Sequence, residues 1–487
     1  MVRKSWFVLL LVAQVLAAGE LLAAPVTHGV VAGEVSSDSA VIWSRTDREA
    51  VMNVRLTSGK HDDIQKIRVQ AKDDYTGKIE IDGLKADTEY RYHVWFGDDE
   101  HERKSHEARV TGSFRTAPSP KKEKPVTFAW GGDLAGQNVC RDVTEGFPIF
   151  NALNQMSLDF FVGLGDMIYA DGTCEATGRY GNSQVPGNFL QAANMDDYWA
   201  HWKYNREDNS YRTLLSKMPY YAIWDDHEVV NDFGPLHDTR TAPPYTAGVH
   251  LMPLGLKAFL DYNPIVVAQN TPKRLYRNVR WGKHLEMFIL DTRQYRDANL
   301  TPDSTQYPKT MLGREQLVWL KESLHKSDAT WKIIVSSVPM SIPTGSAAGG
   351  RDGWANYDQT TGFENELSDI LHSLKDQGER NVVFITTDVH FAEVFRYTPF
   401  IDEASFKVHE VVTGPLNAGL FPNRAYDSTL NAESLFFYGP SASVTAWSDA
   451  KPWMNFGLAH IDAHGRLSLS VNKIDGEPVY TLTLDPQ

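Results

Sequence analysis

The feature that most constrains the fold is a set of five apolar runs, each followed by an acidic residue. The runs are rich in Val, Ile, Phe and Tyr, and amphipathic stretches typical of helices lie between them. They cover residues 126–130, 158–164, 219–224, 285–290 and 381–387, and are followed by Asp133, Asp166, Asp225, Asp291 and Asp388. Buried strands that alternate with helices predict an α/β fold in which helices cover the sheets.

The acidic residues at the strand ends indicate a metal site. Ligands of α/β proteins bind at the carboxyl ends of the strands, and carboxylates that converge there repel one another unless cations neutralise them. Any one of these aspartates is equally well explained as a helix cap. Five together, two of them beside His227 and His390, favour oxygen and nitrogen ligands for Fe, Mn, Zn or Ca.

The string Gly165-Asp166-Met167-Ile168-Tyr169 is the most informative of these ends. The two carboxylate oxygens of Asp166 are able to bridge two cations. Tyr169 is a candidate phenolate ligand, and since the phenol has a pKa of about 10, such a ligand favours a strongly acidic ion such as Fe(III). The alternative for Tyr169 is a buried aromatic residue whose hydroxyl is hydrogen-bonded.

The charge of the chain limits its partners. The 487 residues hold 48 Lys and Arg against 62 Asp and Glu, a formal net charge of −14. This balance argues against a nucleic-acid-binding surface, and it means that an anionic substrate needs positive charge supplied locally. The 2 Cys exclude a disulfide-rich scaffold and a zinc site of four cysteines.

Residues 1–24 have the pattern of a signal peptide. Arg3 and Lys4 precede an apolar run over residues 6–16, and small residues follow. The run is short for a membrane anchor, which is the alternative, and no later segment predicts a membrane span. We therefore expect a secreted or periplasmic protein.

Residues 25–118 have the pattern of a β-sandwich. Short runs of β-branched and aromatic residues are separated by turn residues, and the segment Leu84–Tyr92 resembles the tyrosine corner of a fibronectin type III domain. A polar, Pro-rich linker follows at residues 119–125. The larger α/β domain is expected over residues 126–487.

The order of the motifs resembles a known family. GGD, GLGDMIY, WDDHE, LDTR and TTDVHF follow the sandwich in that order. They resemble the PhoD-type alkaline phosphatases, a branch of the calcineurin-like metallophosphoesterases related to purple acid phosphatases. The resemblance implies an αββα domain, with two packed sheets flanked by helices. It also implies Fe(III) with a divalent ion, Ca(II) first and Zn(II) or Mn(II) as alternatives, and hydrolysis of phosphomonoesters and phosphodiesters at alkaline pH.

The resemblance also implies roles for individual residues. Asp133 stands at the first-strand ligand, where some members have Cys, Asp166 at the bridging carboxylate and Tyr169 at the phenolate ligand. The remaining predicted metal ligands are Asp226, Asn231, Asp388 and His390. Strand 331–335 ends in Ser336-Ser337, where many relatives supply a His, and this departure favours a hard second ion such as Ca(II).

The mechanism implied by the resemblance is attack of a metal-bound hydroxide on phosphorus in a dinuclear site. His227 would donate to the phosphoryl or leaving oxygen. Arg293 is a candidate catalytic residue and, with Arg141 and Arg296, a candidate to bind phosphate, with ordinary ion pairs as the alternative for each.

Cys140 and Cys174 are both expected in loops at the same edge of the sheet. We predict that they form a disulfide near the site, with two free buried thiols as the alternative. Two other functions remain open. One is a phospholipid-cleaving phosphodiesterase on the same fold, which exposed apolar loops around Phe400 or Leu420-Phe421 would favour. The other is a non-catalytic binding protein with a degenerate phosphatase domain. The sequence does not indicate the natural substrate or the oligomeric state.

Overall fold

The structure, a computed structural model, describes residues 24–487 except Lys60 and the segments 98–108, 235–247, 299–302, 345–351, 356–361 and 423–424. The predicted signal peptide therefore lies outside the described residues, apart from Ala24. None of the helices in the described residues is both long enough and apolar enough to cross a membrane.

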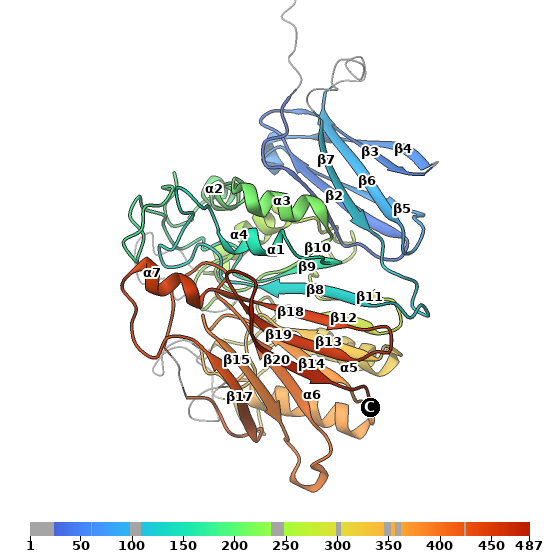
Figure 1. Ribbon diagram of the computed structural model, residues 1–487, viewed down its shortest axis with the longest axis vertical. Helices are drawn as coiled ribbons and strands as arrows, with labels where there is room; N and C mark the ends of the chain where they lie inside the picture. The colour runs from blue at the N-terminus through green and yellow to red at the C-terminus, as the bar shows by residue number, and fades with distance from the viewer. Residues whose placement is uncertain are drawn as a thin grey trace, which may run out of the picture.

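The N-terminal region is a β-sandwich, drawn in blue at the top of Figure 1. Its core is a separate hydrophobic cluster that includes Ile42, Tyr92 and Phe114. The tyrosine corner is confirmed, because the Tyr90 hydroxyl accepts a hydrogen bond from the Lys85 N–H at 2.9 Å. The strands are β1 (Val30–Gly33), β2 (Ser39–Arg45), β3 (Ala50–Ser58), β4 (His61–Val69), β5 (Thr76–Asp82), β6 (Glu89–Phe96) and β7 (Val110–Arg115), with a 3₁₀ turn at Ala71–Asp73.

The sandwich shares one of its sheets with the domain that follows. Strands β1, β2 and β5 continue a nine-stranded sheet in the order β20-β19-β18-β8-β9-β10-β1-β2-β5, and Gly33 pairs with Tyr220 in parallel. A Cβ at Gly33 would lie 2.2 Å from Pro264 and 2.6 Å from the Tyr220 carbonyl, so only glycine permits this approach. The sandwich is thus joined directly to β10, whose far end carries the DDHE sequence.

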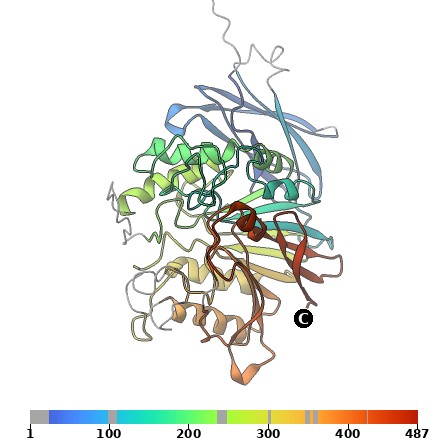
Figure 2. The same ribbon diagram turned by 60° about the vertical axis from the view of Figure 1, so that its left-hand side comes forward.

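The remaining chain forms the predicted αββα arrangement. The nine-stranded sheet packs on a seven-stranded sheet in the order β11-β12-β13-β14-β16-β15-β17. One large core links the facing sides of the two sheets and reaches α2, α3 and α4, and a second core lies between the seven-stranded sheet and α5 and α6. Figure 2 shows these two sets of helices on opposite outer faces.

The elements of this domain follow in chain order. The strands are β8 (Val126–Gly131), β9 (Phe160–Leu164), β10 (Tyr220–Ile223), β11 (Arg277–Trp281), β12 (Leu285–Ile289), β13 (Trp331–Val335), β14 (Val382–Thr386), β15 (Ala392–Tyr397), β16 (Val408–Val412), β17 (Ala432–Tyr438), β18 (Asn455–Ile461), β19 (Leu467–Lys473) and β20 (Pro478–Leu484). The helices are α1 (Ile149–Leu153), α2 (Met195–Arg206), α3 (Asn209–Lys217), α4 (Gly248–Tyr262), α5 (Gly313–Lys326), α6 (Glu364–Asp376) and α7 (Trp447–Ala450), with short 3₁₀ turns at Ile401–Glu403 and Lys451–Trp453.

The topology explains where the site forms. Strands β8, β9 and β10 are parallel neighbours in one sheet, and β12, β13 and β14 are parallel neighbours in the other. Parallel neighbours end at the same edge, so the residues after each strand gather there. Because the two sheets are stacked, both edges contribute to a single site.

The Cys140–Cys174 disulfide is present, as predicted, and no free cysteine remains. It closes a segment with a sequence separation of 34 residues. The entropy of closing such a loop in the unfolded chain corresponds to about 3–4 kcal/mol. We expect the double variant Cys140→Ser/Cys174→Ser to lower the free energy of unfolding by up to this amount. Urea denaturation measures it, with reduced wild type as the control. Equal stability of oxidised and reduced protein would contradict the prediction.

Candidate metal centre

Three of the five predicted strand ends line one cavity, which encloses about 400 Å³, and a fourth lies directly behind its wall. Asp166 follows β9, Asp226 and His227 follow β10, and Asp388 and His390 follow β14. Asp133, which follows β8, lies beside His390 with its side chain fully buried. The described residues that line the cavity are Gln137, Asp166, Asp226, His227, Asn231, Asp232, Pro343, Thr344, Asp352, Asp388, Val389, His390 and Phe421.

The first group of candidate ligands combines a carboxylate, a phenol and an imidazole. The Tyr169 hydroxyl lies 2.9 Å from Nε2 of His390 and 3.4 Å from Oδ1 of Asp133. The same two atoms of His390 and Asp133 are 3.5 Å apart. Nδ1 of His390 bonds to the Gly419 carbonyl, which fixes the ring so that Nε2 faces the group.

The second group consists of carboxylates and His227. Ligand atoms of Asp166, Asp226 and His227 lie within 4.8 Å of one another, as do those of Asp166, Asp225, Asp226 and Asp388. Asp226 also belongs to a third group with Asp232 and Asp352. Asp166 is therefore shared between two of these groups, and Asp226 is shared among all three.

Four side chains of the site stand on a backbone that residues other than glycine rarely adopt. The φ angles of Asp133, Asp166, Asp388 and His390 are 62°, 51°, 83° and 61°. Left-handed conformations cost free energy, and they persist where surrounding contacts fix them. At the end of β9 these contacts come from Glu228, whose carboxylate accepts the N–H groups of Asp166 and Met167.

Burial and mutual repulsion raise the pKa values of the carboxyl groups. Burial raises the pKa of Asp133 to about 7. Burial, followed by the charge of Asp226, raises the pKa of Asp166 well above its usual range, and burial with the charge of Asp225 does the same for Asp388. The protein alone thus disfavours the ionised forms, which is the situation that bound cations reverse.

His227 is held by a residue that sequence reasoning missed. Asp171 Oδ1 lies 2.7 Å from Nδ1 of His227, and its Oδ2 accepts the Asn231 N–H at 2.9 Å. Burial lowers the pKa of His227, but the charges of Asp171 and then Asp226 outweigh it and raise the pKa to about 10. Nε2 of His227 lies 4.0 Å from Asp166 Oδ2. The imidazole is therefore fixed in the cavity wall by its pairing with Asp171.

The three arginines predicted to bind phosphate do not line the cavity. The Arg141 guanidinium pairs with Glu207 at 3.0 Å and lies over the Tyr204 ring at 4.1 Å. Arg293 and Arg296 are buried behind the site. All three arginines therefore form ion pairs with carboxylates of the protein, which was the alternative to phosphate binding.

Arg293 has a structural task at this position. Its Nε donates to Asp225 at 2.6 Å, its Nη2 donates to Asp352 at 2.8 Å and lies 3.6 Å from Asp226. Nη1 of Arg296 donates to Asp352 at 2.8 Å. In this geometry Arg293 positions two carboxylates that follow β10 and the loop carboxylate of Asp352, instead of reaching into the cavity.

Of two further predicted residues, Asp291 lies outside the cavity and Asn231 lies on its wall. Asp291 is buried and accepts hydrogen bonds from the Trp224 indole and the Arg293 N–H, so the fifth strand end does not reach the cavity. Asn231 lines the cavity, and its side chain is exposed.

Besides Asp171, the sequence assigned no role to Glu228, Asp232 or Asp352, and it indicated Asp225 only as one of the five strand-end aspartates. Asp225 and Glu228 stand inside the DDHE sequence, and Asp171 stands five residues after Asp166, so a signal for these three was present. Asp352 lies in a Gly-rich stretch that gives no such signal.

The donor set fits hard metal ions. It combines carboxylates, one phenol and imidazole nitrogens, which suit Fe and Ca better than soft ions. The buried Oδ2 of Asp225 accepts no hydrogen bond from the described residues, whereas Oδ1 of Asp226 has Arg293 Nη2 at 3.6 Å. An oxygen such as Oδ2 of Asp225 is costly to bury without a donor or a cation.

Two stacked sheets between helices, with carboxylates and histidines at the parallel strand ends, define a metallophosphoesterase-type protein. The chain belongs to the PhoD-like phosphatase family, whose model matches residues 128–470. The model of the PhoD-like phosphatase N-terminal domain matches residues 13–118.

Individual proteins show the same similarity. Alkaline phosphatase D of Bacillus subtilis is 26% identical over 402 residues, and the match covers 75% of this chain but only 64% of that protein. The solved structure of PhoD has a TM-score of 0.73 at 20% identity and covers 95% of this chain and 93% of that one. A purple acid phosphatase from yellow lupin has a TM-score of 0.59 at 13% identity, covering 94% and 74%. These two structures share the fold.

Proposed function

We propose that this protein is an exported, metal-dependent phosphatase or phosphodiesterase that hydrolyses phosphate esters. The observation that carries the proposal is that Asp166, His227 and His390 line one cavity within a PhoD-like phosphatase chain. Asp133 and Tyr169 contact His390 behind the cavity wall. The name of the Bacillus relative, alkaline phosphatase D, supports the same activity.

The residues have distinct tasks in this proposal. Asp133, Tyr169 and His390 would hold one cation, Asp226 and Asp388 a second, with Asp166 between them. When bound, the cations would neutralise the carboxylates, orient the phosphate and activate water as the nucleophile. His227, held by Asp171, donates a proton or a hydrogen bond to the leaving oxygen.

We expect Asp171→Asn to lower kcat by about 10- to 100-fold, the range typical of residues that orient a ligand or catalytic group. Loss of the Asp171 charge lowers the pKa of His227, so the alkaline limb of the pH–rate profile moves to lower pH. Asp171→Glu, which keeps the charge, should restore part of this limb. A lower rate with an unchanged profile would indicate a structural role only.

We expect the purified protein to contain iron and to absorb visible light through the phenolate of Tyr169. Tyr169→Phe should abolish this absorption while keeping the ring packing on His227, whose centroid lies 4.1 Å away. Absorption spectra and metal analysis of both proteins test this. A colourless, iron-free and fully active wild type would reject Fe(III) at this position.

The experiment that tests the proposed function is hydrolysis of a panel of phosphomonoesters, phosphodiesters and phospholipids, combined with metal analysis. Turnover of the first two classes supports the proposal. No turnover of any ester by the fully metallated protein would favour the non-catalytic binding protein instead.

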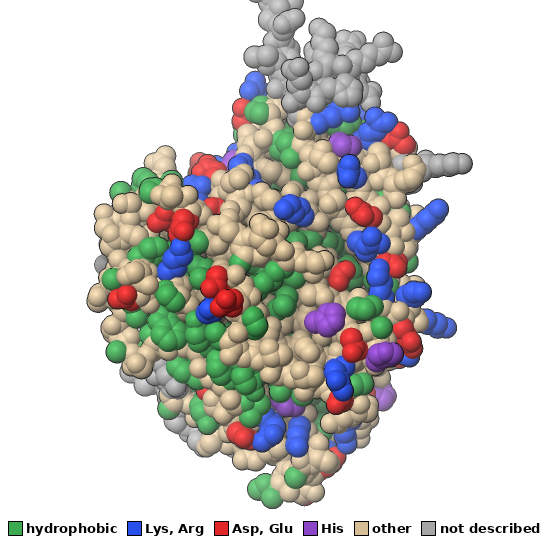
Figure 3. Space-filling view, viewed as in Figure 1, with side chains coloured by type: hydrophobic (Ala, Val, Ile, Leu, Met, Phe, Trp, Pro, Cys, Tyr) green, Lys and Arg blue, Asp and Glu red, His purple; other side chains and the backbone are tan. Residues whose placement is uncertain are grey.

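The apolar loops that would favour the phospholipid alternative are exposed only in part. Phe400 and Leu420 are each 7% exposed, whereas Ile401, next to Phe400, is 97% exposed and Phe421 is half-buried on the metal cavity. The phospholipids in the ester panel therefore test this alternative directly. On the face shown in Figure 3, hydrophobic side chains gather over β17, whereas acidic and basic side chains are interspersed. That face shows no continuous basic surface suited to nucleic acid.

Export rests on residues 1–24, and mass spectrometry of the protein recovered from a culture medium or periplasm would test it. A mature N-terminus among the small residues after the apolar run, at about residues 18–25, supports cleavage of a signal peptide. An intact N-terminus in the cytoplasm would reject it.

A further inference from the structure

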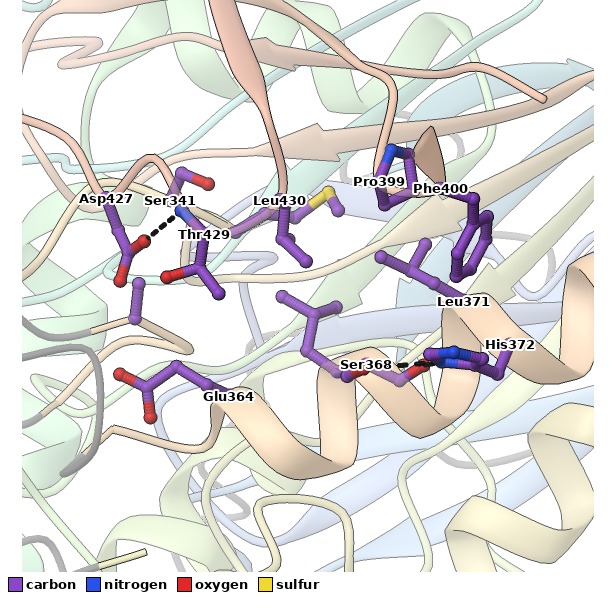
Figure 4. A pocket seen from close by; sticks show the side chains of 13 residues that line it. Ser341, Glu364, Ser368, Leu371, His372, Pro399, Phe400, Asp427, Thr429 and Leu430 are labelled. Atoms are coloured by element: carbon purple, nitrogen blue, oxygen red, sulfur yellow. Dashed lines mark hydrogen bonds between the residues drawn. The ribbon is translucent and has the colours of Figure 1, made fainter. Parts of the chain in front are cut away.

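A second cavity lies between α6 and the loops that follow β13 and β15 (Figure 4). It encloses about 100 Å³ and shares none of its described lining residues with the metal cavity. No metal-ligand role has been assigned to its residues.

Most of this cavity is apolar. Leu367, Leu371 and Phe400 line it and are each at most 7% exposed. Half-buried Leu430 lies across from Leu371 in Figure 4. An apolar cavity of about 150 Å³ accepts benzene. This smaller but open cavity therefore fits an alkyl chain of about four carbons.

One end of the cavity is acidic. Asp427 is 5% exposed, and its Oδ1 accepts the Thr429 N–H at 2.6 Å. Its Oδ2 accepts no hydrogen bond from the described residues. Figure 4 shows the carboxylate of Glu364, at the start of α6, on the same side of the cavity. Neither Lys nor Arg is among the described lining residues.

We propose that this cavity is a binding site for a small primary ammonium compound with an apolar chain. The ammonium group would donate to Asp427 Oδ2, and the chain would lie against the leucines. A buried carboxylate oxygen without a donor is costly, and a charged donor relieves this cost most effectively. A bare Ca²⁺ ion fits less well, because it needs six to eight oxygen ligands and these walls are mostly apolar.

The test is titration of the full-length protein with n-butylammonium, n-butanol and butyrate, followed by calorimetry and saturation-transfer NMR. The three probes share a chain and differ in charge. We expect saturable binding of n-butylammonium and at least about tenfold weaker binding of the other two. Equal binding of n-butanol, or no saturable binding of n-butylammonium, would overturn the proposal.

Variants identify the site. Asp427→Asn should weaken n-butylammonium binding at least about tenfold, and Leu430→Trp, at a half-buried position, should block it by filling the cavity. Asp376→Asn, an exposed residue of the same helix, is the matched control and should bind as wild type does. Undiminished binding to correctly folded Asp427→Asn would overturn the assignment. None of these measurements depends on phosphate-ester hydrolysis.

Discussion

Replacing Asp166 with Asn is expected to lower kcat/KM for phosphate-ester hydrolysis by about 1,000-fold or more, equivalent to about 4 kcal/mol of transition-state stabilisation. Asp166 is 1% exposed and belongs to two of the overlapping carboxylate groups. An amide keeps the shape but removes the charge that would hold two cations together. Steady-state kinetics and metal stoichiometry measure the effect.

The same variant has a second expected signature that distinguishes loss of a ligand from misfolding. In the metal-free protein, burial and then the charges of Asp226 and other carboxylates destabilise the ionised form of Asp166 and raise its pKa, so keeping this carboxyl in the site costs stability. Metal-free Asp166→Asn should therefore melt at a higher temperature than metal-free wild type. Asp82→Asn, at the exposed end of β5, should change neither activity nor melting temperature. Substantial activity in Asp166→Asn would remove this residue from the site.

Removing the metals is expected to make stability strongly dependent on pH. In the folded protein, burial first of all raises the pKa of Asp225 to about 6, of Asp133 to about 7 and of Glu228 to about 8. In the unfolded chain these groups ionise near pH 4. Between about pH 4 and pH 8 the folded state binds more protons, so the free energy of unfolding falls as pH rises.

The size of the effect is large for a single site. For Asp133 alone, the rise in pKa to about 7 corresponds to about 4 kcal/mol lost once the group is ionised. Melting temperatures from about pH 5 to about pH 8.5, a range that brackets these three pKa values, would measure it, once with chelator and once with iron and calcium restored. Bound cations stabilise the ionised carboxylates, so the restored protein should show a flatter curve. Parallel curves would contradict a metal centre built from these residues.

Much of the fold was predictable because its signals are local. The apolar runs that became β8, β9, β10, β12 and β14 each have the length and composition of a buried strand. The tyrosine corner at Tyr90 likewise depends on residues close in sequence. The pairing of β1 with β10 was not predictable, since it joins residues almost 190 positions apart through a contact that only Gly33 permits.

The candidate site, like the fold, was predictable only in part. The motifs indicated Asp133, Asp166, Tyr169 and His390 because ligands that follow parallel strands meet at one edge. The roles of the arginines could not be read in this manner. Arg293 stands two residues after a strand end, as a phosphate-binding residue would, but its guanidinium is directed toward Asp225 and Asp352.

By itself, the sequence determined which residue types arrive at the strand ends, because strand periodicity and chain order are encoded locally. Only the tertiary structure decided which of them face the cavity. Asp291 follows a strand as Asp166 does, yet it bonds to Trp224 and Arg293 and stays outside the site. Asp171 was brought to His227, 56 positions away, by packing of separate loops. The direction of a side chain depends on neighbours that are distant in sequence, and the local sequence pattern does not encode those neighbours.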